Sequence, residues 1–172
     1  MAHTNVSLIG FMGAGKSTIG RGLAARLEKS FVETDVLVEQ RAGMTVADIF
    51  ALQSEERFRE IESEVVEQAA QMRDCVISCG GGVVLRHENV AALRASSIVV
   101  FLDVTPRAVI QRLRPGSRVR PLLDTDDQET RVRELMEQRL PAYCAAADIT
   151  VQTDGLTVEQ ILQTTEERLK QL

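Results

Sequence analysis

A phosphate-binding sequence lies close to the N-terminus of the chain. Residues 10–17 read Gly-Phe-Met-Gly-Ala-Gly-Lys-Ser, a complete G-x-x-x-x-G-K-S motif. In such a loop the glycines let backbone N–H groups turn toward nucleotide phosphates, and the following helix N-terminus favours the same negative charge. Lys16 is expected to reach the β- and γ-phosphates, and the Ser17 hydroxyl is expected to bind Mg²⁺.

The residues on either side supply the structural context that this motif requires. Residues 6–9 are mainly apolar and suit a buried strand, and residues 16–27 carry Ile19, Leu23 and Leu27 at helical spacing. Strand, glycine-rich turn and helix in this order argue against a chance glycine-rich turn.

Acidic residues and glycines follow the next two predicted strands. Asp35 comes after Glu33 and Thr34, at the sheet edge where α/β proteins bind ligands. A carboxylate there could accept a proton from an attacking hydroxyl, could cap the helix predicted from residue 36, or could do both. Further on, residues 80–82 are three consecutive glycines, which either let the backbone approach a ligand closely or make a plain tight turn.

Two charged side chains fall on a helix face that should be apolar. On the helix predicted at residues 55–72, Glu62 projects between Phe58 and Val65, and Arg59 lies at the edge of the same stripe. An unpaired charge there would be costly. Two interpretations are open at this point. The pair is either a simple i, i+3 ion pair, or Arg59 binds an anion and Glu62 holds it in place.

A third charge is misplaced on the helix predicted at residues 126–140. Arg139 follows Leu135 and Met136 on the apolar face, and Pro141 is expected to end the helix. The arginine could extend to solvent or bind the last carbonyl groups. It could instead be the second half of a clamp on a planar anion such as a carboxylate.

Residues 113–127 show little helical or strand periodicity and carry several arginines, prolines and aspartates. A connection of this length without secondary structure is usually functional. Phosphoryl transfer needs water excluded and positive charge added. We therefore predict a lid over the phosphate site in preference to a solvated charged loop.

Short apolar strands alternate with longer helical segments along the chain. Strands are predicted at residues 5–9, 31–34, 75–79, 98–102 and 149–152. Helices are predicted at residues 16–27, 36–42, 46–52, 55–72, 88–95, 106–113, 126–140 and 158–172. Alternation with strands this apolar predicts an α/β three-layer sandwich with a central five-stranded parallel sheet, in a single domain over residues 1–172.

Composition excludes several classes of protein. The net charge is −5 and the chain has one Tyr and no Trp, which argues against a nucleic-acid partner. No apolar run approaches the ~20 residues needed to span a bilayer, and the first predicted strand leaves no room for a signal peptide. The three cysteines, Cys75, Cys79 and Cys144, lack metal-site spacing and suggest reduced thiols. We expect a cytoplasmic protein with no membrane partner.

Taken together, these features resemble the shikimate kinase family. The matching segments are residues 10–18, Glu-Thr-Asp at 33–35, Phe-Arg-x-x-Glu at 58–62, Gly-Gly-Gly at 80–82, Arg-Pro-Leu-Leu at 120–123 and Arg-x-Pro-x-Tyr at 139–143. They run through nearly the full chain in the expected order. The phosphate loop is shared with many unrelated proteins, whereas the combination is specific.

The resemblance implies that the γ-phosphoryl group of ATP moves to the 3-hydroxyl of shikimate, with Mg²⁺ as cofactor. It implies a P-loop kinase fold with a helical substrate-binding region at about residues 33–62 and the lid at about 113–127. Catalytic roles are implied for Lys16, for Asp35 as base, and for Arg120 on the lid. ATP contacts are implied for Gly10, Gly13, Ala14, Gly15, Lys16, Ser17, Thr18, Arg112, Arg114, Arg120 and Thr153. Shikimate contacts are implied for Asp35, Arg59, Glu62, Gly80, Gly81, Gly82 and Arg139, with Arg59 and Arg139 on the carboxylate. Metal contacts are implied for Ser17 and, through a water molecule, for Glu33.

The chain departs from the family pattern at two places. Glu33 stands where the family usually has Asp, which keeps the charge but adds one methylene group. The family also usually has an Arg seven residues before Arg120, stacked on adenine. This chain has Leu113 there, between Arg112 and Arg114, so either arginine could cover the base.

Two rival functions are considered from sequence. Another small-molecule kinase of similar shape, such as a gluconate or nucleoside monophosphate kinase, would share many of these features. A GTPase switch would need an Asn-Lys-x-Asp motif, but the only asparagines are Asn5 and Asn89, and neither is followed by Lys. The expected partners are the small molecules ATP and shikimate, and the expected state is a monomer.

Overall fold

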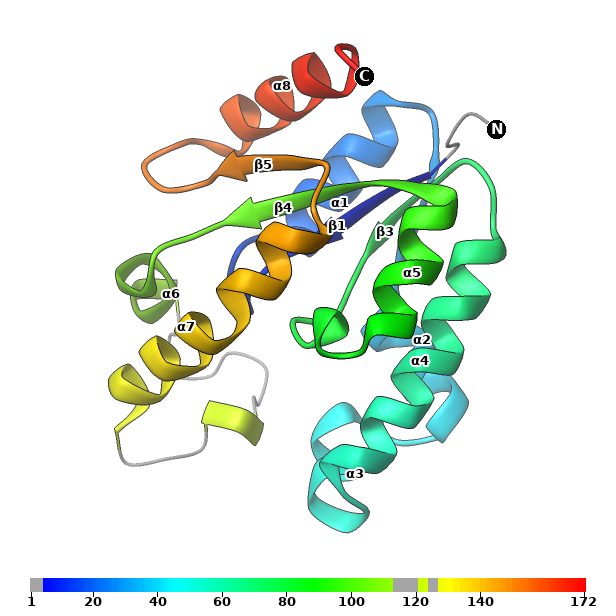
Figure 1. Ribbon diagram of the computed structural model, residues 1–172, viewed down its shortest axis with the longest axis vertical. Coiled ribbons are helices and arrows are strands. Elements are labelled where there is room, and N and C mark those ends of the chain that lie inside the picture. Colours follow the sequence, from blue (N-terminus) through cyan, green and yellow to red (C-terminus); the bar gives the residue numbers. More distant parts are fainter. Residues whose placement is uncertain (1–4, 113–120, 124–126) are drawn as a thin grey trace.

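The computed structural model of the chain describes residues 5–112, 121–123 and 127–172 (Figure 1). Its five strands form one sheet in the order β2-β3-β1-β4-β5, and every neighbouring pair is parallel. The strands are β1 (Asn5–Ile9), β2 (Ser30–Glu33), β3 (Cys75–Ser78), β4 (Ser97–Asp103) and β5 (Ile149–Gln152). The predicted five-stranded parallel sheet is confirmed.

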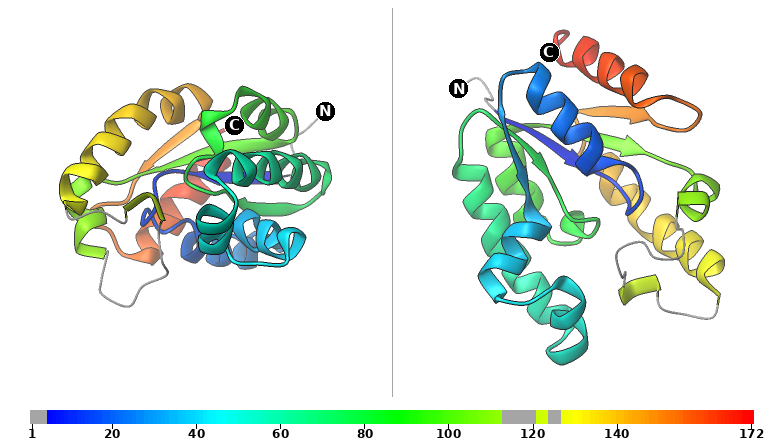
Figure 2. Two further views of the ribbon diagram at one scale, coloured as in Figure 1. Left: turned by 90° about the horizontal axis from the view of Figure 1, so that it is seen from below. Right: turned by 180° about the vertical axis from the view of Figure 1, so that it is seen from behind.

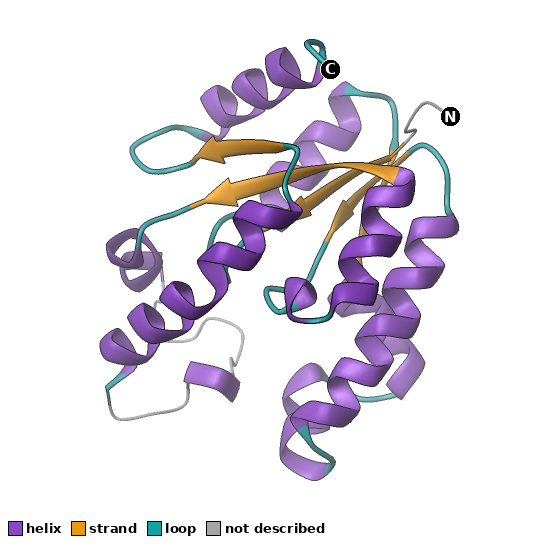
Figure 3. Cartoon of the chain, in the orientation of Figure 1, coloured by secondary structure: helices purple, strands orange, loops and turns teal. Residues whose placement is uncertain are grey.

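Helices cover both faces of this sheet. They are α1 (Lys16–Arg26), α2 (Thr34–Ala42), α3 (Val46–Leu52), α4 (Glu55–Gln71), α5 (His87–Ser96), α6 (Pro106–Arg112), α7 (Gln128–Ala146) and α8 (Val158–Leu169), with 3-10 turns η1 (Val83–Leu85) and η2 (Pro121–Leu123). Helices α5 and α7 lie on one face, and α1 and α8 lie on the other (Figures 1 and 2). The three layers are also visible in the colouring of Figure 3.

The central strands are mainly apolar because neither of their faces meets water. All five residues of β1 and all four of β3 are buried. Strand β1 lies at the centre of the sheet, between β3 and β4. The loops after β1 and β3 therefore leave the same sheet edge side by side, which is where ligands bind in folds of this kind.

A second, smaller core holds helices α2, α3 and α4 together. It consists of Val38, Ile49, Phe58, Ile61 and Val65. Helices α3 and α4 each begin at a side-chain cap, in which the hydroxyl oxygen of Thr45 or Ser54 accepts a backbone N–H bond. This helical unit includes most of the region predicted at residues 33–62. Its core fixes the orientation of α4, and so the direction in which the charged residues of α4 point.

The predicted end of α7 is wrong. The helix continues past Pro141 to Ala146. A proline inside a helix costs about 3 kcal/mol or more, because it lacks an N–H and its ring clashes with the preceding turn. Burial of the last turn offsets this cost, since the ring of Tyr143 is 2% exposed and stacks on Phe101 with centroids 5.0 Å apart.

The capping interpretation of Asp35 is also wrong. Helix α2 begins at Thr34, and its N-cap residue is Glu33, which makes no side-chain cap bond. Asp35 therefore lies inside the first turn of the helix. An acidic residue there still interacts favourably with the helix dipole, but it is not needed to close the helix end.

Other sequence expectations concern the thiols and the membrane. Cys75 and Cys79 are free and buried, and Cys144 is free and exposed. Within the part of the chain that the structure describes, no helix has the length and apolar character needed to cross a membrane.

Candidate active site

A cavity of about 340 Å³ opens at the carboxyl edge of the sheet and brings most of the predicted site residues together. It begins at the phosphate loop and extends between the α2–α4 unit and α7. The predicted residues that line it are Gly13, Gly15, Lys16, Ser17, Thr18, Glu33, Asp35, Arg59, Glu62, Gly80, Gly81, Gly82 and Arg139. Residues up to 126 positions apart in the chain thus face one space.

The phosphate loop has the conformation that its glycines permit. Gly10 has φ +143°, and a Cβ atom there would lie 2.6 Å from the carbonyl oxygen of Leu102, so only glycine fits. Gly15, at φ 95°, is the N-cap of α1. The ammonium group of Lys16 donates to the carbonyl oxygens of Gly10 and Phe11, at 2.8 and 2.9 Å. Positive charge and a helix N-terminus therefore meet at this end of the cavity.

Oxygen donors for a metal ion lie beside the loop. The Ser17 hydroxyl donates to Oε1 of Glu33 at 2.5 Å, and Oε2 of Glu33 accepts a bond from Arg21 at 3.1 Å. Mg²⁺ prefers oxygen ligands and keeps several of its waters. A hydroxyl at the phosphate site with a carboxylate directly behind it fits such an ion.

Two carboxylates converge on the start of the glycine loop. A Cβ atom built on Gly80 would lie 2.6 Å from Oε1 of Glu62 and 2.9 Å from Oδ1 of Asp35. The N–H of Gly80 donates to the hydroxyl of the buried Thr34 at 3.0 Å, which ties the loop to the start of α2. Asp35 thus faces the cavity between the phosphate loop and the buried charges of α4.

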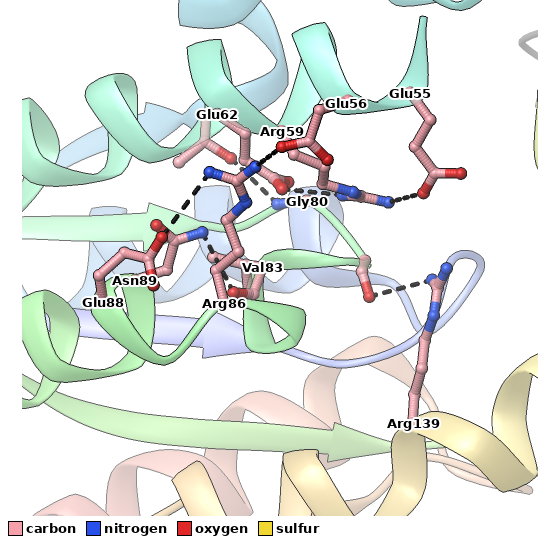
Figure 4. Close-up of polar contacts among 12 residues, drawn as sticks. Glu55, Glu56, Arg59, Glu62, Gly80, Val83, Arg86, Glu88, Asn89 and Arg139 are labelled. Atoms are coloured by element: carbon pink, nitrogen blue, oxygen red, sulfur yellow. Dashed lines mark hydrogen bonds and ion pairs between the residues drawn. The ribbon is translucent and has the colours of Figure 1, made fainter.

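Arg59 is both paired and exposed to the cavity. Its guanidinium donates to Glu62 at 2.8 Å and to Glu55 at 3.0 Å (Figure 4). Burial lowers the pKa of Arg59, but its two carboxylate partners outweigh burial and leave the pKa above its ordinary value. Burial raises the pKa of Glu62, and the charge of Arg59 opposes this shift. The 2.8 Å contact makes the Arg59–Glu62 ion pair, and Arg59 also lines the cavity, so the two interpretations from sequence are compatible.

Arg139 is buried without such compensation. It is 4% exposed and lies well inside α7, so the interpretations that place it in solvent or at a helix end are wrong. Its Nη1 donates to the carbonyl oxygen of Gly81 at 3.3 Å, and it forms no ion pair with any described residue. Burial lowers the pKa of Arg139. A desolvated cation that faces a cavity is suited to bind an anion.

Each of the three glycines after β3 leaves room for a different neighbour. Gly80 makes room for the two carboxylates, a Cβ atom on Gly82 would overlap the guanidinium of Arg59, and one on Gly81 would lie 3.3 Å from the N–H nitrogen of Met12. The N–H of Val83 also donates to the carbonyl of Gly80 at 3.1 Å, which closes a turn. The backbone thus makes a tight turn and approaches the side chains of the site.

Comparison with known proteins gives the family. A family model described as shikimate kinase matches residues 12–170. The chain belongs to the shikimate kinase family. It is 45% identical to a shikimate kinase from Symbiobacterium thermophilum, over 97% of each chain. It is 40% identical to a shikimate kinase from Caldanaerobacter subterraneus subsp. tengcongensis, over 92% of each chain.

A solved structure of the same family has the same fold. The shikimate kinase from Acinetobacter baumannii in complex with shikimate superposes with a TM-score of 0.94 at 30% identity, over 99% of this chain and 94% of that chain. The P-loop kinase fold predicted from sequence is confirmed.

Several residues expected to contact ATP in a shikimate kinase lie outside the lining of the cavity. Ala14 is buried, and its N–H donates to the carbonyl of Phe11 at 3.1 Å. Thr153 is buried, and its hydroxyl and its N–H both donate to the carbonyl of Asp103 at 2.9 Å. Arg112 donates to the carbonyl of Gly13 at 2.9 Å and so lies against the phosphate loop. Gly10 is buried, and its carbonyl accepts the bond from Lys16.

The lid prediction falls mainly outside the described residues, as do Arg114 and Arg120. Within the predicted lid, the structure describes residues 121–123 and 127. Leu122 of this segment lines the cavity. The roles of the two arginines stay predictions.

Sequence reasoning missed an apolar wall and two supporting side chains. Val46 and Phe50 of α3 line the cavity, and their i, i+4 spacing is the signal that could have found them. Thr34 and Tyr143 hold the glycine loop from opposite sides through their hydroxyl groups. Their partners are distant in the chain, so no local pattern indicates these contacts.

Proposed function

We propose that the protein transfers the γ-phosphoryl group of ATP to the 3-hydroxyl of shikimate, giving shikimate 3-phosphate and ADP. The observation that carries this proposal is the arrangement of charged groups along the cavity. A phosphate loop forms one end, and two buried guanidinium groups from α4 and α7 lie beyond the carboxylate of Asp35. An acceptor with a hydroxyl near Asp35 and a carboxylate near Arg59 and Arg139 matches this arrangement, and membership of the family supports it.

The two arginines bind and orient the acceptor. A planar carboxylate can take two parallel bonds from a guanidinium group, whereas an ammonium group offers only a point charge. Arg59 keeps its orientation through Glu62, and Arg139 reaches the site from the opposite wall. Fixing the carboxylate at both walls sets the position of the ring and of the hydroxyl that reacts.

Asp35 acts as the general base. It accepts the proton of the 3-hydroxyl while that oxygen forms a bond to the γ-phosphorus and the bond to the bridging oxygen of ADP breaks. Positioned general bases of this kind contribute about 10²- to 10⁴-fold in rate.

The phosphate end stabilises the transferring group. Lys16 and the N–H groups at the start of α1 hold the phosphates, and Ser17 with Glu33 would hold Mg²⁺, the latter through a water molecule. When bound, Mg²⁺ offsets negative charge on the phosphate oxygens. Arg120, from the predicted lid, adds a further positive charge in this proposal, and Arg112 or Arg114 covers the adenine.

We propose a cytoplasmic monomer that acts as a single domain on these two small substrates. The experiment is a measurement of ADP release from ATP and Mg²⁺ after addition of shikimate, gluconate or AMP. Of the three acceptors, we expect only shikimate to cause ADP release. A Lys16→Ala variant purified in the same way controls for contaminating kinases and should be inactive. Faster release with gluconate or AMP than with shikimate would contradict the proposal.

A further inference from the structure

We propose that Tyr143 is a positioning residue for acceptor recognition. Its hydroxyl binds the carbonyl of Gly81 and thereby leaves the guanidinium of Arg139 available for the substrate carboxylate. This inference rests on the carboxylate clamp of the proposed function.

Tyr143 and Arg139 compete for one acceptor atom. They are four residues apart on α7, so both side chains project from the same face of the helix. The Tyr143 hydroxyl donates a short hydrogen bond to the carbonyl oxygen of Gly81, and Nη1 of Arg139 donates to the same oxygen at 3.3 Å. Since N–H···O bonds are usually 2.7–3.2 Å long, the contact of Arg139 is the weaker one. The dashed line from Arg139 in Figure 4 marks it.

The tyrosine is held firmly in this position. Its ring stacks on Phe101 with centroids 5.0 Å apart and planes 15° apart. Burial raises the pKa of Tyr143 to about 12. The hydroxyl therefore keeps its proton around neutral pH and remains a donor, while the stacked ring fixes its direction.

Removal of the hydroxyl would change the balance at Arg139. A buried carbonyl without a donor is costly, and Arg139 is the other described group that donates to the Gly81 oxygen. The guanidinium would be drawn toward the loop, and N–H groups that a carboxylate needs for two parallel bonds would be used by the protein. The hydroxyl of Tyr143 thus keeps the cation available.

The same bond orients the glycine loop. A peptide unit is planar, so holding the carbonyl of Gly81 also fixes the direction of the N–H of Gly82. Gly82 packs against the guanidinium of Arg59 on the opposite wall. Tyr143 therefore acts on the acceptor end of the cavity from both sides, and the phosphate end should not depend on its hydroxyl.

A Tyr143→Phe variant tests this inference, because it keeps the stacked ring and removes the hydroxyl. We expect the dissociation constant of shikimate to rise roughly 3- to 10-fold, the range expected for loss of one buried hydrogen bond. The KM for ATP should stay within about 2-fold of the wild-type value, since no phosphate contact is lost.

Thr165→Val is the matched control. Thr165 is buried on α8 and is not one of the residues that line the cavity. Its hydroxyl donates to the carbonyl of Ile161 at 2.7 Å. This variant should lose a similar amount of thermal stability with unchanged shikimate binding. If Tyr143→Phe behaves as Thr165→Val does, the hydroxyl is merely structural and the inference is wrong.

An Arg139→Lys variant separates this inference from the proposed function. If Arg139→Lys does not weaken shikimate binding, the carboxylate clamp is wrong and the role of Tyr143 falls with it. If Arg139→Lys weakens binding and Tyr143→Phe does not, only the role of Tyr143 is wrong. In the double variant we expect Tyr143→Phe to add less than about 2-fold, because both changes act on one group. A full additional loss there would also contradict the inference.

Discussion

The two walls of the cavity carry the same cation in opposite electrostatic states. On the α4 wall, Arg59 has two carboxylate partners at 2.8 and 3.0 Å, and its pKa is raised in spite of burial. On the α7 wall, Arg139 shares the carbonyl of Gly81 with a tyrosine, and burial lowers its pKa. One arginine is compensated by the fold, and the other lacks a described counter-charge.

This difference separates two tasks that both involve binding an anion. Arg59 is part of the structure, because without it Glu62 would be a buried carboxylate with no cation beside it. Arg139 forms no ion pair with any residue that the structure describes, so its positive charge is available to a ligand. The comparison predicts that changes on the α4 wall affect folding and binding together, whereas changes on the α7 wall affect mainly binding.

The largest expected effect is on stability. Arg59→Met leaves Glu62 buried and unpaired, which should lower the free energy of unfolding by about 3–5 kcal/mol. Arg139→Met replaces a desolvated cation by an apolar side chain of similar volume. We therefore expect the free energy of unfolding to change by no more than about 1 kcal/mol. Urea unfolding of both variants measures the two values. Equal losses would mean that the two walls do not differ as described.

Next in size is the effect on acceptor binding. Arg139→Lys keeps the charge but loses one of two parallel bonds, so it should weaken shikimate by roughly 10- to 100-fold, the range for loss of a hydrogen bond to a charged group at about 1.5–3 kcal/mol. Arg59→Lys should weaken it less, because a lysine there still compensates Glu62. Titration calorimetry with shikimate and with ATP provides both affinities. A loss of ATP affinity as large as the loss of shikimate affinity would place the arginines at the phosphate end instead.

A change in Asp35 should lower the turnover rate and leave the carboxylate contacts of Arg59 and Arg139 intact. Asp35→Asn keeps the shape of the side chain and removes the base, so turnover should fall on the order of 10²-fold or more. Shikimate affinity should change much less than turnover. Steady-state kinetics with a binding measurement gives this ratio. Near-normal turnover would exclude Asp35 as the base.

The smallest expected effect is on metal dependence. If Glu33 orders a water bound to Mg²⁺, Glu33→Gln should raise the Mg²⁺ concentration for half-maximal activity roughly 10-fold, the lower end of the effect of an outer-sphere ligand. Glu33→Asp keeps the charge and should be tolerated. Binding of Mn²⁺ to the ADP complex of each variant gives a readout independent of turnover. Identical metal dependence in all three proteins would exclude this role.

Sequence predicts the phosphate end of the site well because its determinants are local. The strand, the loop and the helix that form it are contiguous, and the glycines that permit the turn are in the motif itself. The acceptor end depends on contacts between distant segments. Spacing indicated that Arg59 and Arg139 were misplaced, but it could not show that one has carboxylate partners and the other a loop carbonyl 58 residues away.

One of the two errors in the fold prediction has the same origin. Pro141 is a strong local signal for a helix end, but burial of Tyr143 against Phe101 stabilises the continued helix. Asp35 is a good N-cap residue by type, but the helix begins at Thr34, two residues earlier than predicted. At Pro141, tertiary packing outweighs the local preference.

The most direct test of the account compares shikimate with its neutral carboxamide by titration calorimetry. The amide keeps the ring and all hydroxyl groups and removes the charge that Arg139 is expected to compensate. We predict that the wild-type protein binds the amide at least about 30-fold more weakly than the acid. The Arg139→Met variant, which lacks the cation on this wall, should discriminate much less between the two. Equal binding of acid and amide by the wild-type protein would contradict the account, because the buried arginines would then be structural.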